Sequence, residues 1–178
     1  MIPAIRGPLR SRTIDDLTQE ALQLEELGVK ELSLIAQDST AYGNDLNNGA
    51  GKRQNVVHLL EHLLKATSIP WLRLLYLYPT GVRDDLLQLM ANNPRIVPYL
   101  DIPMQHVSDK ILSGMNRRYN AEQLYATINK IRSTLPDIAI RTTFLVGFPG
   151  ETEKDFLELE TFLKSIPIDH VGVFPYAN

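Results

Sequence analysis

Four segments of the chain alternate between apolar and polar residues with a period of two. They span residues 30–43, 71–79, 98–106 and 140–152. In the first of them Leu32, Leu34 and Ala36 would share one face of a strand, while Glu31, Ser33 and Gln37 would share the other. Strands of a parallel sheet covered by helices are usually apolar on both faces, so a regular polar face needs a reason.

The polar positions point to one shared surface. If the strands line a single barrel, its inner face carries Glu31, Arg73, Asp101, Gln105, Arg141 and Thr143. Charges buried at that density need partners or a polar ligand. The pattern therefore predicts a barrel that holds a charged small molecule, with leucines 32, 34 and 100 and Phe144 turned away from it.

Helices and strands are expected to alternate along the chain. A helix should begin after Thr13 and end before Gly28, and further helices are predicted at about 55–66, 84–91, 121–134 and 152–165, with a short one after Ser108. Strands are predicted at about 30–36, 71–77, 97–102, 139–146 and 170–174. This order implies an open, parallel partial (β/α) barrel whose ligands lie at the carboxyl ends of the strands. Its opening helix has no strand before it, so about five of six strands are present.

The composition of the chain narrows the classes of protein to which it can belong. A chain of 178 residues with 44% hydrophobic content is expected to form one domain, residues 1–178. The net charge of −3 provides no general attraction to DNA or RNA, and the chain has neither a membrane span nor a signal peptide, so we expect a cytoplasmic protein. The loop at 43–54 contains GK but lacks the spacing of a phosphate loop. There is no cysteine to bind a metal or cluster.

Six segments carry a family resemblance: IPAIRGPLRSR, IAQDSTAYG, LRLLYLYP, YLDIPMQHVSDKILSGMNRR, RTTFLVGFPGETEKDF and VGVFPYAN. In this order and spacing they resemble the radical S-adenosylmethionine domain of the methylthiotransferases, over essentially the whole chain. AQDSTAYG favours the group that methylthiolates an aspartate of small-subunit ribosomal protein number twelve. The alternatives are the group that modifies tRNA adenosine and a non-catalytic barrel that only binds a partner.

The resemblance implies S-adenosylmethionine and a four-iron four-sulfur cluster as cofactors. In the family a CxxxCxxC loop comes just before IPxxRG, whereas this sequence starts at Met1-Ile2-Pro3. We therefore expect a fragment that lacks the cluster loop, an N-terminal cluster domain and a C-terminal RNA-binding-like domain, through which RNA or ribosome contacts would be made. The isolated chain should be inactive, and its catalytic residues stay unassigned.

The resemblance and the polar strand ends together suggest cofactor-binding residues. Gln37 and Asp38 would receive the methionyl amino group, although Asp38 and Ser39 are also typical of a capped loop. Gln105 and Ser108 would bind the ribose hydroxyls, although Ser108 is equally suited to cap the helix after it.

The segment at residues 140–152 suggests a site for an anion and a site for adenine. Arg141, with Thr143 on the same face, would pair with the methionyl carboxylate; the alternative for Arg141 is an internal ion pair with Asp101 or Glu31. Gly147, Phe148, Pro149 and Gly150, with Phe174, would enclose the adenine, although the same loop is also typical of a tight strand-to-helix turn.

Two further signals have mainly structural interpretations. His58, Glu61 and His62 form an HxxEH pattern, which two-histidine zinc proteases share, but the helix around it has a packing face and no further ligand is evident. Arg6, Arg10 and Arg12 form a basic opening segment, which we expect to be solvated and disordered.

Overall fold

The structure is a computed structural model that describes residues 5, 7–46 and 54–177. Its helices are α2 (Ile14–Glu26), α3 (Val56–Ala66), α4 (Asp84–Asn92), α5 (Asp109–Gly114), α6 (Ala121–Thr134) and α7 (Glu153–Ser165), with 3-10 turns η1 (Ser39–Ala41) and η2 (Pro79–Gly81). Its strands are β1 (Glu31–Leu34), β2 (Trp71–Leu74), β3 (Ile96–Asp101), β4 (Ala139–Val146) and β5 (His170–Pro175). Element types and order agree with the prediction.

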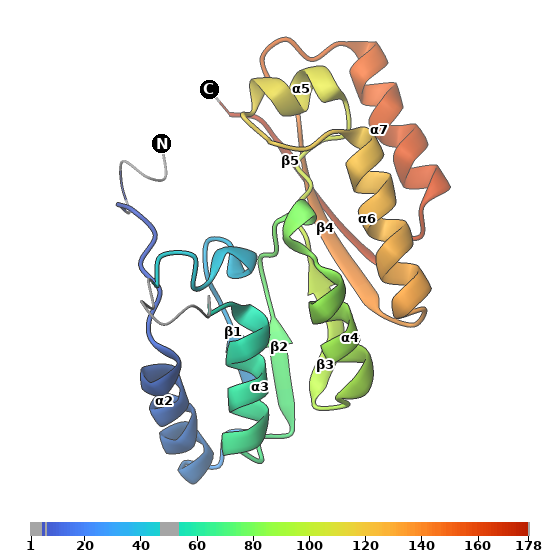
Figure 1. Ribbon diagram of the computed structural model, residues 1–178. Helices are drawn as coiled ribbons and strands as arrows, with labels where there is room; N and C mark the ends of the chain where they lie inside the picture. The colour runs from blue at the N-terminus through green and yellow to red at the C-terminus, as the bar shows by residue number, and fades with distance from the viewer. Residues whose placement is uncertain (1–4, 6, 47–53, 178) are drawn as a thin grey trace.

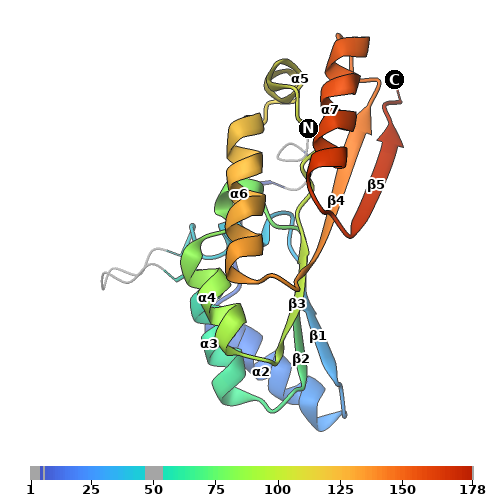
Figure 2. The ribbon, with the colours of Figure 1, turned by 90° about the vertical axis from the view of Figure 1, so that its right-hand side faces the viewer.

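The five strands form one parallel sheet in the order β1-β2-β3-β4-β5 (Figure 1). Figure 2 shows the sheet from its edge, with α3, α4 and α6 on one side of it. Helix α7 packs on that side too, because the rings of Phe162 and Phe144 meet edge to face at 6.3 Å. The predicted open, parallel partial barrel is confirmed.

The hydrophobic core lies between the sheet and the helices. Leu72, Leu74, Leu100 and Phe144 are fully buried there. The opposite face of the same strands carries the alternate residues, among them Arg73, Asp101 and Arg141, which face away from the helices. We call it the open face. The predicted division into an apolar helix side and a polar side is confirmed, and its cause is the period of two in the strands.

Local signals determine where the helices begin and end. Thr13 caps α2, with its hydroxyl oxygen accepting the backbone N–H of Asp16 at 3.2 Å, and Gly28 follows the helix with a φ of +81°. Asn120 and Gln123 form a reciprocal capping box at the start of α6. The predicted bounds of these helices were therefore correct to within about two residues.

Strands β1 and β2 are shorter than predicted, ending at Leu34 and Leu74. Beyond β2 the φ of +57° at Tyr76 interrupts the regular strand conformation, although Leu75 and Leu77 still donate their backbone N–H groups to the carbonyls of Leu34 and Asp101. Of the predicted loop at 43–54, residues 47–53 lie outside the described part, as does the GK pair. No helix in the described part of the chain is long and apolar enough to cross a membrane.

Candidate functional site

Two ion pairs bridge neighbouring strands on the open face. Arg73 on β2 donates Nε to Glu31 Oε1 at 2.5 Å and Nη2 to Glu31 Oε2 at 3.0 Å, and these bonds lower the pKa of the Glu31 carboxyl. Arg141 on β4 donates Nη1 to Asp101 Oδ1 on β3 at 2.7 Å. Each inward charge has the partner that its burial requires.

The Arg141 pair is uneven in its exposure. The Asp101 side chain is 2% exposed, whereas the Arg141 side chain is 38% exposed. Of the two roles considered for Arg141, the ion pair with Asp101 is therefore present. Because a guanidinium has five N–H groups in a fork, this pair leaves donors on Arg141 that face the open side. The carboxylate-binding role stays a proposal.

Tyrosines lie around these charges. The Arg73 guanidinium carbon is 5.1 Å from the centre of the Tyr99 ring, a cation–π distance. Burial raises the pKa of the Tyr99 phenol, and the Asp101 carboxylate raises it further. The hydrogen bond to Asp101 raises the pKa of the Arg141 guanidinium, and Tyr99 and Tyr76 add to that rise. Neither tyrosine was among the predicted site residues.

At the end of β1 the predicted loop cap is present. Asp38 Oδ1 accepts the backbone N–H of Thr40 at 2.9 Å and its hydroxyl at 2.5 Å. Ser39 ties this loop to β2, donating its hydroxyl to the Leu75 carbonyl at 2.6 Å. Gln37, just before this cap, is exposed. The loop therefore holds Gln37 and Asp38 at the carboxyl edge of the sheet, where they were predicted.

Gln105 joins the end of β3 to β4. Its backbone N–H donates to the Thr143 carbonyl and its carbonyl accepts from the Leu145 N–H, each at 2.8 Å. Its φ of +69° is rare for a residue other than glycine. Gln105 is half-buried beside Thr143, which is also half-buried on the open face. Backbone hydrogen bonds therefore place these two predicted inward residues side by side.

The Ser108 side chain does not cap α5 as predicted. It stands at the N-cap position of α5, but its side chain caps nothing there. Its hydroxyl is buried and donates to Asp155 Oδ1 on α7 at 2.6 Å. The capping prediction is wrong because the chain brings a carboxylate within reach of that hydroxyl, and a charged acceptor makes the stronger bond. A ribose contact of Ser108 stays a prediction.

A group of polar contacts joins the loop after β3 to the loop after β4. The buried His106 accepts the Ser108 backbone N–H on Nδ1 at 3.0 Å, and its Nε2 lies 3.7 Å from Glu151 Oε1. Lys110 Nζ donates to the Gly150 carbonyl at 2.7 Å. Together with the bond from Ser108 to Asp155, these contacts form what we call the loop staple.

Burial and hydrogen bonding shift two titrating groups of the staple in the same direction. Burial lowers the pKa of His106, partly offset by Glu151, so the ring stays neutral with its proton on Nε2. The hydroxyl of Ser108, followed by that of Thr152, lowers the pKa of the Asp155 carboxyl. The sequence contained these residues, but no periodicity marks a pair 47 positions apart.

The segment 147–150 forms the predicted tight turn. Gly147 and Gly150 have φ values of +75° and +88° with open space where a Cβ would stand, so backbone is accessible there. The Phe148 ring lies edge-on to Tyr176 at 5.5 Å and approaches Gly114 of α5. Pro149 is exposed. Phe148 is therefore committed to packing, while Phe174, 55% exposed on β5, leaves an apolar surface free.

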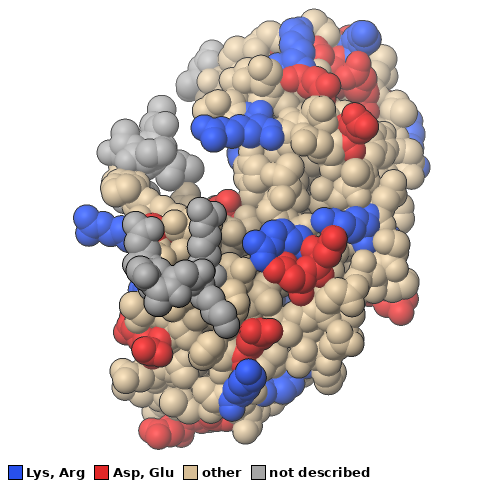
Figure 3. Space-filling view, in the orientation of Figure 1, with Lys and Arg blue, Asp and Glu red and all other residues tan. Residues whose placement is uncertain are grey.

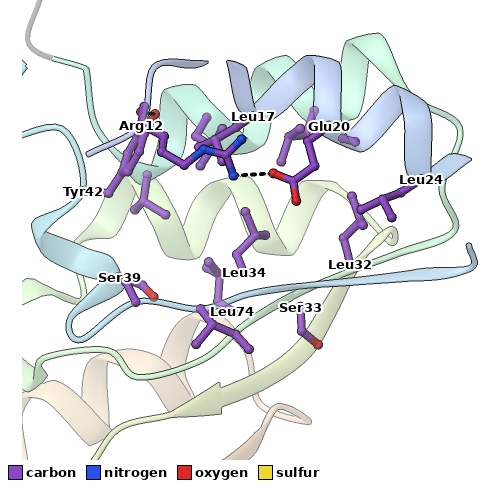
Figure 4. Close-up of a pocket in the computed structure, with 16 residues that line it drawn as sticks. Arg12, Leu17, Glu20, Leu24, Leu32, Ser33, Leu34, Ser39, Tyr42 and Leu74 are labelled. Carbon is purple, nitrogen blue, oxygen red and sulfur yellow. Dashed lines mark hydrogen bonds and ion pairs between the residues drawn. The ribbon is translucent and has the colours of Figure 1, made fainter. Parts of the chain in front are cut away.

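The sheet edge beside these loops is hollowed. Figure 3 shows a notch between the loop that follows β1 and the part built by α5 and β5. A separate cavity of about 300 Å³ lies between α2, α3 and β1 (Figure 4). It is lined mainly by apolar side chains such as Leu24, Leu32 and Leu59, and an ion pair between Arg12 and Glu20 lies beside it. This cavity is not on the open face, and the site residues do not line it.

The remaining sequence signals have structural roles. Within residues 5, 7–46 and 54–177, no group of three or more metal-ligating side chains converges, and His62 Nδ1 bonds to the His58 carbonyl at 2.8 Å. The HxxEH pattern therefore does not gather a metal site there. Arg12 is not free, since it pairs with Asp16 and Glu20 on α2, whereas Arg10 is exposed. Arg6 lies outside the described residues.

Comparison with known proteins identifies the family. The model of the radical SAM superfamily matches residues 1–163. The chain belongs to this superfamily. Over 178 residues it is 58% identical to the ribosomal protein uS12 methylthiotransferase RimO of Desulfotalea psychrophila, covering 100% of this chain and 39% of that protein. RimO of Elusimicrobium minutum is 46% identical over 99% of this chain and 40% of its own length. The chain thus spans about two fifths of the curated relatives it matches.

Solved structures agree on the fold of this superfamily. TsrM, a radical S-adenosylmethionine methyltransferase from Kitasatospora setae, superposes with a TM-score of 0.70 at 16% identity, covering 91% of this chain and 30% of that one. Coproporphyrinogen III oxidase HemN from Escherichia coli gives 0.66 at 16% identity, covering 92% and 36%. The methylthiotransferase resemblance in the sequence is confirmed by the RimO relatives, and the barrel by these folds.

Proposed function

We propose that this chain is the S-adenosylmethionine-binding barrel of a RimO-type enzyme, which adds a methylthio group to an aspartate of ribosomal protein uS12 in the cytoplasm. The observation that carries the proposal is 58% identity over all 178 residues with a protein of that name. The matched region includes both faces of the sheet and all five strand ends. The open face supports it, because its polar residues form a surface suited to a charged ligand.

The residues on the open face fit S-adenosylmethionine. Gln37 and Asp38 would receive its amino group, Arg141 its carboxylate and Gln105 its ribose, with Thr143 beside them. The backbone of residues 147–150 and the exposed ring of Phe174 would enclose the adenine, and Phe148 would support that loop from beneath. When bound, the molecule supplies a sulfonium that is cleaved reductively in this superfamily.

The residues do not fit the iron–sulfur cluster. Such clusters are held by cysteine thiolates, and the 178-residue sequence has no cysteine. The resemblance implies that a separate CxxxCxxC loop carries them. In this proposal the single domain described here binds and orients the cofactor, and segments beyond it supply the cluster and contact the ribosomal protein or its RNA. No step of the reaction is assigned to residues of this chain.

A chimera would test the proposal. This chain replaces the matching 39% of Desulfotalea psychrophila RimO, and the product is assayed on uS12 and, separately, on tRNA. Mass spectrometry should detect a methylthio group on the aspartate of uS12 at a rate within about tenfold of the parent. A second chimera carrying Arg141→Gln should lose most of that activity while remaining folded.

Three results of the chimera experiment would contradict the proposal. Methylthiolation of tRNA instead of uS12 would assign the chain to the tRNA-modifying group. A folded chimera without activity on either substrate would favour a barrel that only binds. An Arg141→Gln chimera as active as its parent would remove Arg141 from the site. Circular dichroism of each chimera separates loss of function from loss of fold.

A further inference from the structure

The histidine of the loop staple is completely buried and only partly hydrogen-bonded. The His106 side chain is 0% exposed, and its Nδ1 accepts the Ser108 backbone N–H at 3.0 Å, so the proton of the neutral ring is on Nε2. Among the residues that the structure describes, Nε2 has no hydrogen-bond partner. Native proteins leave few buried donors in this state, because such a group has lost its water without gaining an acceptor. The unpaired Nε2 therefore needs an explanation.

The acceptor that faces this nitrogen belongs to Glu151. Glu151 Oε1 lies 3.7 Å from His106 Nε2, which is about 0.5–1 Å longer than an N–H···O hydrogen bond. The Glu151 side chain is only 7% exposed, so little water competes for it. The buried carboxylate of Asp155 is already occupied, since its Oδ1 accepts from Ser108 and its Oδ2 from Thr152. Of these two carboxylates, Glu151 is therefore the one that can bond His106 after a small movement.

Glu151 also holds the turn at residues 147–150. Its Oε2 accepts the Phe148 backbone N–H at 3.0 Å, and its own backbone N–H donates to the Phe148 carbonyl at 2.8 Å. Both polar backbone groups of Phe148 are thus bonded to one residue. A displacement of the turn consequently moves the Glu151 carboxylate, and the distance from that carboxylate to His106 depends on where the turn lies.

The turn forms the solvent-facing side of this contact. Gly147, Pro149 and Gly150 are exposed, whereas His106 is not. A molecule that binds on the exposed side of the turn presses it toward the buried histidine. The hydrogen bond that then forms is favourable, because its acceptor is a carboxylate and little water reaches it. A ligand that binds the closed position more tightly than the open one shifts the turn to the closed position.

We propose that His106 and Glu151 are positioning residues for the turn at 147–150, and that a nucleoside bound to the turn closes the contact between His106 Nε2 and Glu151 Oε1 into a hydrogen bond. This inference rests on the proposed function, which assigns the adenine of S-adenosylmethionine to that turn. It adds a closing movement and two side chains that act on the ligand only through the turn. The carboxylate end of the cofactor has no part in it.

Nuclear magnetic resonance of the four histidines tests the closure. The whole chain, isotope-labelled in histidine, is titrated with 5′-methylthioadenosine, which carries the nucleoside without a carboxylate. The His106 Nε2–H proton should move downfield and exchange more slowly with water in the complex, because a hydrogen bond to a carboxylate deshields and protects it. The rings of His58, His62 and His170 should not show this response, and they serve as internal controls.

Calorimetric titration with the same nucleoside adds a rescue test. Glu151→Ala removes the acceptor for His106 and the side-chain bond to Phe148, so it should weaken binding by about tenfold. Glu151→Gln keeps one oxygen that can accept from either N–H group, so it should recover part of that loss. Glu153→Ala removes an exposed carboxylate at the start of α7 and should leave the affinity unchanged.

Two results would each overturn this proposal alone: nucleoside binding with an unmoved His106 Nε2–H resonance, or equal affinity of Glu151→Ala and the wild type. Binding of S-adenosylhomocysteine without binding of the nucleoside would also overturn it, since the turn would then not hold the nucleoside. A wild type that binds neither ligand would overturn the proposed function with it. Circular dichroism checks the fold of Glu151→Ala, and if that variant is unfolded, Glu151→Gln and the histidine resonances decide.

Discussion

Removal of Arg141 should destabilise the fold far more than removal of its partner. Arg141→Met leaves the Asp101 carboxylate, 2% exposed, without its counter-charge, whereas Asp101→Asn leaves an arginine side chain that is 38% exposed and can turn to water. Breaking a fully buried pair costs about 3–5 kcal/mol when a charge is left behind. Because water reaches the Arg141 side, we expect about 3 kcal/mol for Arg141→Met and about 1 kcal/mol for Asp101→Asn.

The second ion pair of the open face is the matched control. Arg73 and Glu31 are bonded at least as closely, but their side chains are 27% and 30% exposed. Arg73→Met should therefore cost no more than about 1 kcal/mol. In the double variant Asp101→Asn with Arg141→Met no charge remains buried, so its cost should fall below the sum of the single ones by about 1–2 kcal/mol.

Urea unfolding followed by circular dichroism measures all four variants. For a chain of this size, the loss at Arg141 corresponds to a fall in melting temperature of roughly 6–12 °C. The reasoning is refuted if Arg141→Met costs no more than Arg73→Met, or if the double variant is simply additive. Either result would mean that water solvates Asp101 in the variant and that the burial of its side chain carries no penalty.

Three other perturbations have defined outcomes. Burial keeps the pKa of His106 below its ordinary 6.5, so the unfolded chain binds a proton at this residue before the folded chain does. The free energy of unfolding should therefore fall as the pH drops from about 7 to 5, and His106→Gln should flatten that slope. The lowered pKa of Asp155 should add a further loss of stability below about pH 4. A Cβ at Gly43 would overlap the carbonyl of Gln54 in addition to the left-handed strain, whereas Gly28 has only the strain, so Gly43→Ala should cost at least about 2 kcal/mol and Gly28→Ala about 1 by urea unfolding. Anaerobic reconstitution with iron and sulfide should leave the isolated chain without cluster absorbance, and a stoichiometric cluster would contradict the thiolate argument.

The fold could be predicted because its signals are local. Alternation in β1 to β4 determined which face of the sheet is polar, and Thr13 and Gly28 marked both ends of α2. Partner choice could not be predicted in this way. The ion pair of Arg141 with Asp101 was one of two open alternatives, since spacing along the chain does not decide between a ligand and an internal acid.

The parts of the site that sequence reasoning missed depend on tertiary contacts. Tyr76 follows an apolar strand and continues its alternation as a core residue would, and only the contacts from Ser39 turn it outward. The hydroxyl of Ser108 bonds a carboxylate on another helix, which no capping rule could anticipate. Phe148 was predicted, with Phe174, as an apolar wall for the adenine, and its contact with Gly114 of α5 could not be anticipated from the sequence.

The loop staple joins the segments that follow β3 and β4, so we expect them to move together. Ser108 and Lys110, at the start of α5, are bonded to Asp155 at the start of α7 and to Gly150 in the loop before it, so neither segment can move away without breaking charge-assisted contacts with the other. A molecule that binds to residues 147–150 would therefore also restrain Gln105. Part of its binding free energy would be used to order the segment after β3 as well as the loop after β4. We therefore expect occupancy of one strand end to restrain the next through these side chains, without any movement of the sheet.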